Sequence, residues 1–468
     1  MDNQAVAPTL PLAAWAATVK PDDIPARVRE RTSHLLLDTI ASAIAGRHGD
    51  ETAQIESTAR AIADGDQATG IGSGRLSRIG AAFLNGYQVT AVTVCDVYRP
   101  NLCHVTPEVV PPALAAAEGR HVSGSDLLTA IAVGLEVTTR IGRGIRYASF
   151  RARGWHSPGV IGAFGGAASA GRVLGLDGDQ MRYAFGLAGA QASGTFAHWG
   201  TPTIKFHQAH GSTAGLLAAT LAQSGFRASE EVLTHEDGGI FNAYSDGGDP
   251  AAVIADLGST WELERISMRL WPAASSIQAV VSAVFDLIAA HDVTPDDVGR
   301  MTIALSETTY RLHGEMGWDD RFRALLSTRY AAAVVLHDRA CWLDQFEPQR
   351  IADPALQSFA ADRIRVEVDE TLPVTGAAIT LDFIDGRQVT VRRDVPKGDA
   401  DDPLTNDEIV AKFRLASTRS LSEDAAEHAL ELLLNIEAVT DIDNLMRHLS
   451  SRGTAGGSVQ HQATAGGT

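Results

Sequence analysis

The fold is decided by two runs of sequence, GWHSPGVIGAFGGAASAGR at 154–172 and TIKFHQAHG at 203–211. Glycine and alanine dominate the first run, which carries no charged residue before Arg172. A helix on the surface of a protein would show a charged face opposite its apolar stripe. Small residues instead let helix backbones come close together. The two runs therefore predict a buried pair of central helices with polar side chains at its mouth.

The polar side chains expected at this mouth are His156, Lys205 and His207. Lysine is scarce in this chain, and Lys205 alone lies in an apolar, histidine-rich context. The other three lysines are in polar segments and are expected to be exposed: Lys20, Lys397 and Lys412. A buried ammonium is costly unless it is paired. Lys205 is therefore a candidate for binding an anionic ligand, and a structural ion pair is the alternative.

Composition excludes several classes of function. The 468 residues carry a formal net charge of −18, which argues against binding to nucleic acid or to an anionic membrane surface. Three cysteines without a CxxC motif indicate a reducing, cytoplasmic environment. Residues 1–10 do not resemble a signal peptide, and no apolar run is long enough to span a membrane. We expect a cytoplasmic protein with a small-molecule substrate.

Helical patterns dominate the chain before residue 260. After it, segments appear in which apolar and polar residues alternate. Residues 298–305, 364–368, 377–383 and 388–393 predict strands, and Asp385-Gly386 between the last two is typical of a hairpin turn. The sequence predicts a mainly α protein, with a large all-helical domain at 1–264 and 405–450. A smaller α+β lid domain is inserted at 265–404. The glycine-rich tail at 451–468 is expected to be disordered.

The sequence contains none of the common cofactor-binding motifs that we considered. No strand precedes the glycine-rich runs as a dinucleotide-binding fold requires, and there is no GxxxxGK[ST] phosphate loop. His207 and His210 could share a helix face as metal ligands, but no carboxylate or cysteine joins them at metal spacing. Lys205 beside them would also repel a cation. No metal site is predicted.

A second polar cluster lies in the segment DVYRPNLCHVTP at 96–107. Asp96 and His104 stand eight residues apart in one loop, so both can reach one ligand. An imidazole titrates near neutral pH and can give or take a proton. A capping or structural role for His104 is the alternative.

The sequence resembles the MmgE/PrpD family along nearly its whole length. The resemblance is carried by Leu36-Leu37-Asp38-Thr39 with Gly46, Asp96 with His104, Gly154-Trp155-His156 with Leu174-Gly175-Leu176, Lys205 with Gly211, and residues 327–330. It implies a homodimer, a helical domain with an α+β lid, no metal or organic cofactor, and chemistry on small di- or tricarboxylates. Characterised members dehydrate 2-methylcitrate, decarboxylate cis-aconitate or epimerise iminodisuccinate.

The resemblance also assigns candidate site residues. Asp96, His104, His156, Lys205 and Tyr330 match the family's pocket positions. A further family lysine is replaced here by Arg269, which could clamp a carboxylate without an acid–base role. The expected catalytic residues are His104, His156, Lys205 and Asp96, with Asp96 orienting a histidine. The expected substrate-binding residues are Arg269, Tyr330 and His207.

The main hypothesis is a cofactor-free lyase of the 2-methylcitrate dehydratase type. It would remove a proton next to a carboxylate of a hydroxy-polycarboxylate and expel water. A dicarboxylate isomerase or epimerase, or a cis-aconitate-type decarboxylase, would use the same groups. A non-catalytic carboxylate-binding protein is the alternative from a different class.

Overall fold

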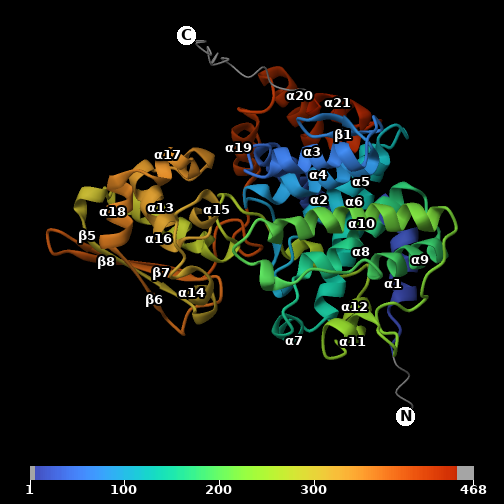
Figure 1. Cartoon of the computed structure of the whole chain (residues 1–468), viewed down its shortest axis with the longest axis horizontal. Helices are drawn as coiled ribbons and strands as arrows, with labels where there is room; N and C mark the ends of the chain where they lie inside the picture. The colour runs from blue at the N-terminus through green and yellow to red at the C-terminus, as the bar shows by residue number, and fades with distance from the viewer. Residues whose placement is uncertain (1–5, 451–468) are drawn as a thin grey trace, which may run out of the picture.

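The computed structural model describes residues 6–450, which form a large helical part and a smaller α+β part side by side (Figure 1). The fold class is therefore the one that the sequence predicts. The expected disorder of 451–468 lies outside the described residues. None of the helices in 6–450 combines the length and the apolar character that a bilayer crossing requires.

The helical part contains the first twelve α-helices and the last three. They are α1 (Thr9–Thr18), α2 (Ala26–Gly46), α3 (Thr52–Ile62), α4 (Arg78–Ala91), α5 (Thr106–Ala117), α6 (Gly124–Gly144), α7 (Tyr147–Ala152), α8 (Ser157–Val173), α9 (Gly178–Gly189), α10 (Thr203–Gln223), α11 (Ile240–Tyr244), α12 (Pro250–Ile254), α19 (Asn406–Ser417), α20 (Glu423–Leu434) and α21 (Asp443–Leu449). Two small antiparallel pairs join them: β1 (Ala68–Gly70) with β2 (Gly74–Leu76), and β3 (Val97–Tyr98) with β4 (Ile266–Ser267).

Helices α8 and α10 are the predicted central pair, and they touch backbone to backbone. A Cβ atom added at Gly215 would lie only 2.6 Å from the carbonyl carbon of Gly166. Every residue of α8 up to Gly171 is buried. The glycines at this crossing therefore determine how near the two helices lie, and α9 connects them.

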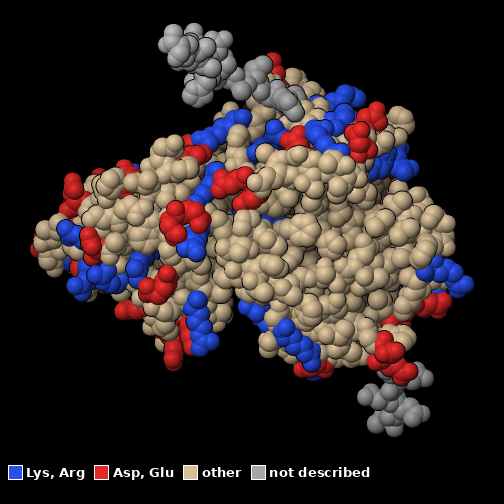
Figure 2. All heavy atoms as spheres, viewed as in Figure 1, with Lys and Arg blue, Asp and Glu red and all other residues tan. Residues whose placement is uncertain are grey.

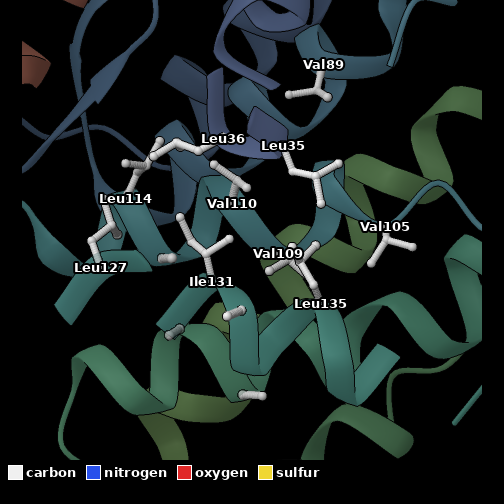
Figure 3. Packing of buried hydrophobic residues seen from close by; sticks show 14 of the residues in the cluster. Leu35, Leu36, Val89, Val105, Val109, Val110, Leu114, Leu127, Ile131 and Leu135 are labelled. Carbon is white, nitrogen blue, oxygen red and sulfur yellow. The ribbon is translucent and has the colours of Figure 1, made fainter. Parts of the chain in front are cut away.

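A layer of aliphatic side chains fills the space between α2, α5 and α6. Figure 3 shows Leu35 and Leu36 of α2 facing Val109 and Val110 of α5, with Ile131 of α6 beneath them. These side chains are fully buried. Because Val109 and Val110 belong to the helix that follows His104, this core also holds the 96–107 loop in place.

The α+β part has a four-stranded sheet in the order β6-β5-β7-β8, with β5 and β6 parallel and the other pairs antiparallel. The strands occupy the predicted ranges: β5 (Val298–Leu305), β6 (Ile364–Val368), β7 (Ala377–Phe383) and β8 (Gln388–Arg393). Its helices are α13 (Gln278–His291), α14 (Glu307–His313), α15 (Arg321–Ala324), α16 (Thr328–Asp338), α17 (Pro348–Ile351) and α18 (Pro354–Asp362). Gly386 has a φ of 87°, as the predicted hairpin turn requires.

The buried apolar residues form two large clusters, one in each part. The first runs from Leu12 to Met268, takes in Trp342 and Leu343, and returns with Leu404 to Leu449. The second lies between Ala273 and Phe383 except for Ile204. We propose the boundaries 1–264 with 405–450, and 265–404, for the two domains, because the clusters divide near these positions. The smaller unit is called the lid below.

Lys412 corrects one sequence expectation, because it is buried and not exposed. Its Nζ lies 2.5 Å from Oδ1 of Asp38, and both side chains are fully buried. The ammonium also donates hydrogen bonds of 2.8 Å to the carbonyls of Val94 and Arg269. It thus joins α19, α2 and the segment that enters the lid. Its partners are far away in the sequence, so its polar neighbours in the chain were misleading.

We predict that Lys412→Met lowers the free energy of unfolding by about 3–5 kcal/mol, because it leaves the Asp38 carboxylate buried without its cation. Chemical denaturation of both proteins measures the difference. The double variant Asp38→Asn/Lys412→Met removes both charges and should recover most of the loss. A single variant as stable as the wild type would show that the pair does not hold this junction.

Candidate active site

A cavity of about 120 Å³ lies where the helical domain meets the lid. Four of the predicted site residues line it, and they come from four separate segments of the chain: His104, His156, Lys205 and Arg269. The other three, Asp96, His207 and Tyr330, do not line it. Sequence reasoning thus placed two imidazoles, an ammonium and a guanidinium around one cavity.

Three helix N-termini bring these side chains to the cavity. His104 lies two residues before the start of α5, His156 is the N-cap residue of α8, and Lys205 lies in the first turn of α10. The N-terminal end of a helix carries a partial positive charge and favours anions. The same end of the helical domain therefore presents both side-chain and backbone positive charge.

Lys205 is buried without a carboxylate partner. Its Nζ donates to the carbonyl of Ala91 at 2.5 Å and lies 4.5 Å from the ring centroid of Phe322. In the described part of the chain, the ion pairs of lysine involve Lys397 and Lys412, and none involves Lys205. Burial lowers the pKa of Lys205 to about 8. An anionic ligand would supply the missing counter-charge.

His104 is held by the backbone of Asp96, and the carboxylate of Asp96 has another role. Nδ1 of His104 lies 2.6 Å from the Asp96 carbonyl, which can only accept, so Nδ1 carries the proton and Nε2 is the acceptor. The Asp96 carboxylate instead accepts from the N–H groups of Val105 and Thr106 at the start of α5. Burial raises the pKa of Asp96 to about 6. Asp96 orients the histidine as expected, but through its main chain.

Burial, followed by the charge of Arg269, lowers the pKa of His104 to about 3, so the imidazole is neutral at pH 7. His156 is also neutral, because burial and the neighbouring His207 lower its pKa well below the usual value. At pH 7 the positive charge on the cavity wall therefore comes from Lys205 and Arg269, and not from the imidazoles.

His207 contacts His156 instead of the cavity. The two Nδ1 atoms are 2.9 Å apart, so one ring donates its proton to the other. Burial lowers the pKa of His207 to about 4, which keeps this second ring neutral as well. The arrangement corrects the expectation that His207 binds substrate directly: its position suits it to orient His156.

Arg269 is buried and anchored before it meets any ligand. Its Nε donates to the carbonyl of Cys95 at 2.5 Å, and its Nη2 lies 3.0 Å from the Cys95 sulfur. Lys412 binds its carbonyl oxygen from behind. Because Cys95 holds the guanidinium and Lys412 holds the main chain, Arg269 presents a cation in a fixed position on the cavity wall.

Tyr330 is not on the cavity, which corrects its predicted role in binding substrate. Its ring packs against Phe346 inside the lid, and its hydroxyl donates to the carbonyl of Gln345 at 2.5 Å. The residue lies in the first turn of α16, where the core of the lid buries its whole side chain. The match of residues 327–330 to the family pattern did not predict the direction in which the Tyr330 side chain points.

Sequence reasoning missed most of the remaining wall. Five aromatic side chains contribute to it, and the lid adds hydroxyl groups; the aromatic residues are Tyr147, Trp155, Phe196, Trp199 and Phe322. The lid hydroxyls belong to Ser275, Ser276, Thr308, Thr309 and Thr375. The pair Ser275-Ser276, shortly after Arg269, was the available signal. Residues 6–450 contain no group of three His, Cys, Asp or Glu side chains placed to hold a metal ion.

We predict that Lys205→Met does not lower the free energy of unfolding and raises it by up to about 1–2 kcal/mol. A cation whose pKa is lowered by burial destabilises the folded state at pH 7, and its hydrogen bond to Ala91 offsets only part of this. Denaturation curves at pH 7 measure the change. Lys412→Met is the matched control with the opposite expected sign. A strong loss of stability in Lys205→Met would indicate a structural ion pair.

Comparison with known proteins gives matches along most of the chain. The MmgE/PrpD N-terminal domain matches residues 11–252, and the MmgE/PrpD C-terminal domain matches residues 271–438. A cis-aconitate decarboxylase-like protein of Aspergillus oryzae is 31% identical, over 94% of this chain and 97% of its own length. The cis-aconitate decarboxylases of Aspergillus terreus and Homo sapiens are 27% and 26% identical, covering 93% and 89% of this chain and 94% and 89% of their own.

Proposed function

The chain belongs to the MmgE/PrpD family, and on that premise we propose that it is a lyase that breaks a bond next to a carboxylate of a small polycarboxylate. The observation that carries the proposal is the meeting of Lys205, Arg269 and two imidazoles on one cavity. Negative charge that develops on a carboxylate as the bond breaks is stabilised by fixed cations in a site sheltered from water. The proposed step uses these side chains alone.

Loss of carbon dioxide is the reaction that the relatives support best, since three of them carry the name of a decarboxylase or a decarboxylase-like protein. The carbon–carbon bond breaks, carbon dioxide leaves, and the electron pair stays on carbon and spreads into a remaining carboxylate. Lys205 and Arg269 would hold that carboxylate. A departing carboxylate against the aromatic wall would be poorly solvated, and it loses its charge as it leaves.

The two cavity histidines have different roles in this proposal. Nε2 of His104 is an acceptor, because Nδ1 is committed to the carbonyl of Asp96. If His207 donates to Nδ1 of His156, then Nε2 of His156 carries a proton that it can deliver to carbon. A bound polycarboxylate adds negative charge to the cavity and raises the pKa of both rings.

Dehydration of a hydroxy-polycarboxylate is the second candidate, and the acceptor at Nε2 of His104 favours it. Decarboxylation needs no base, whereas dehydration needs one to take the proton from carbon before the hydroxyl leaves as water. Lys205 and Arg269 would stabilise the carboxylate next to that carbon in the same way.

Proton NMR in deuterated buffer tests the proposal with a panel of di- and tricarboxylic acids, unsaturated and hydroxylated. We expect one acid to give an unsaturated product, with or without carbon dioxide, and Lys205→Met and His156→Ala to reduce turnover at least about a hundredfold. No turnover and no exchange on any acid would contradict the proposal. Racemisation without an unsaturated product would indicate an epimerase. Tight binding of an acid without hydrogen–deuterium exchange would indicate a non-catalytic binding protein.

The activity should depend on pH through Lys205. Its ammonium is charged below about pH 8 and loses its charge above that value. We therefore predict that kcat/KM falls above about pH 8, by about tenfold for each further pH unit if the charge is required. Lys205→Arg should abolish the decline, because a guanidinium stays protonated. The exposed Lys20→Arg is the control, and an identical decline in Lys205→Arg would assign it to another group.

We propose that the protein is a homodimer that pairs through the outer face of α10. Figure 2 shows a broad face without charged side chains over this helix. Lys205 is the one charged residue of α10 and is buried, whereas Phe206 and Leu217 are 41% and 42% exposed. Phe206, His210, Thr213 and Leu217 follow the spacing of one helix face. An apolar face of this kind is typical of an interface.

We predict that Leu217→Arg converts the dimer to a monomer, because it places a charge in the middle of the α10 face. Light scattering coupled to size-exclusion chromatography measures the mass. Leu434→Arg is the matched control, since Leu434 is 54% exposed but lies on α20. A wild-type protein that is monomeric at micromolar concentration would contradict the proposal.

A further inference from the structure

A serine and a histidine of the lid form a hydrogen-bonded pair on the cavity wall. Ser276 lies in the short 3-10 helix at Ser275–Ile277, just before α13, and lines the cavity. Its Oγ is 2.7 Å from Nε2 of His313, the last residue of α14. His313 is 1% exposed and does not line the cavity. The lid therefore supports one of its wall hydroxyls with a buried imidazole.

The surroundings of His313 determine the direction of this hydrogen bond. Nδ1 of His313 lies 2.8 Å from the carbonyl of Leu326, which can only accept, so Nδ1 carries a proton. Burial lowers the pKa of His313 to about 4, so the ring is neutral at pH 7 and Nε2 has no proton. The Ser276 hydroxyl must then donate to Nε2. The edge of Trp199 packs against the ring and helps to hold it.

We propose that Ser276 is a further substrate-contacting residue, which His313 holds so that its oxygen offers a hydrogen-bond acceptor to the ligand. This inference rests on the proposed function, and it adds a specificity to it. A lone pair at this point suits a ligand that carries a hydroxyl group among its carboxylates. A hydroxy-polycarboxylate can donate a hydrogen bond to this oxygen. A polycarboxylate of the same shape that has no hydroxyl group cannot, so the site should prefer the first.

A carboxylate placed against Ser276 would be disfavoured. Two acceptors would face each other, or the hydroxyl would turn to the ligand and leave the buried Nε2 of His313 without a donor. Lys205 and Arg269 also line this cavity, and both attract carboxylates. The cavity thus offers two cations, one from each domain, together with an accepting hydroxyl from the lid. A ligand with a hydroxyl and several carboxylates satisfies both kinds of group.

The test compares two acids that differ only in the hydroxyl group, citrate and propane-1,2,3-tricarboxylate, by calorimetric titration at pH 7.5. We expect the wild type to bind citrate about 3- to 10-fold more tightly, the range for one neutral hydrogen bond. Ser276→Ala should weaken the binding of citrate by that factor and leave the affinity for propane-1,2,3-tricarboxylate unchanged. Ser275→Ala is the matched control, since it removes the neighbouring hydroxyl on the same wall and should keep the wild-type ratio.

A second variant tests the role of His313 in positioning the serine. In His313→Asn the amide nitrogen can still donate to the Leu326 carbonyl, but the shorter side chain places no acceptor at the former position of Nε2. The freed hydroxyl can donate to a carboxylate, so propane-1,2,3-tricarboxylate should bind more tightly and the ratio should approach one. A purely structural histidine would change the melting temperature but not the ratio.

The outcomes separate this inference from the proposed function. A wild-type ratio near one, or a ratio that Ser276→Ala does not change, would overturn the role of Ser276 while polycarboxylate binding stands. Binding of neither acid to the wild type would overturn both, because the ligand class itself would then be wrong. Equal losses of citrate affinity in Ser275→Ala and Ser276→Ala would also overturn the role of Ser276. The hydrogen bond to His313 would then give Ser276 no advantage over its neighbour.

Discussion

The rest of the structure depends on the contact between α8 and α10, which is possible because Gly166 and Gly215 have no side chains between them. This contact fixes the relative position of two helix N-termini. His156 stands at one of them, Lys205 and His207 at the other, and the two imidazoles are close enough to share a proton. A larger residue at the crossing would separate the helices and, with them, the groups that line the cavity. Packing deep in the helical domain therefore determines the geometry of the site.

The two buried lysines have different surroundings, which suit one of them to a structural role and the other to the role in chemistry that we propose. Lys412 has a carboxylate and two carbonyls around its ammonium, so its charge is satisfied within the fold. Lys205 has one carbonyl and the face of an aromatic ring, and its pKa is lowered as a result. A protein tolerates such an incomplete environment where a ligand completes it. The two sites are connected, because Lys412 also holds the main chain of Arg269, the second cation of the cavity.

Two chemically different kinds of group line the cavity, and both domains contribute to the lining. The helical domain contributes the imidazoles and Lys205, and the segment that enters the lid contributes Arg269. The lid contributes hydroxyl groups, among them Ser276 with its buried partner His313. The aromatic residues lie at the junction, where Trp199 of the helical domain contacts His313 of the lid. A ligand between the domains would therefore contact both of them.

The sequence by itself determined the elements whose evidence is local. The small-residue runs indicated the buried helices, and alternation with Asp385-Gly386 located the strands of the lid. His156 and Lys205 were noticed because they flank the apolar runs, and His104 because it lies in the polar 96–107 loop. The tertiary structure alone decided which partner each polar group meets. Lys412 was expected at the surface because Asp38 lies 374 positions away in the chain. Asp96 turned its carboxylate to a helix end, Tyr330 pointed into the core of the lid, and Ser276 met His313 across 37 positions. Side-chain direction and long-range pairing arise from packing, and neither has a periodic signature along the chain.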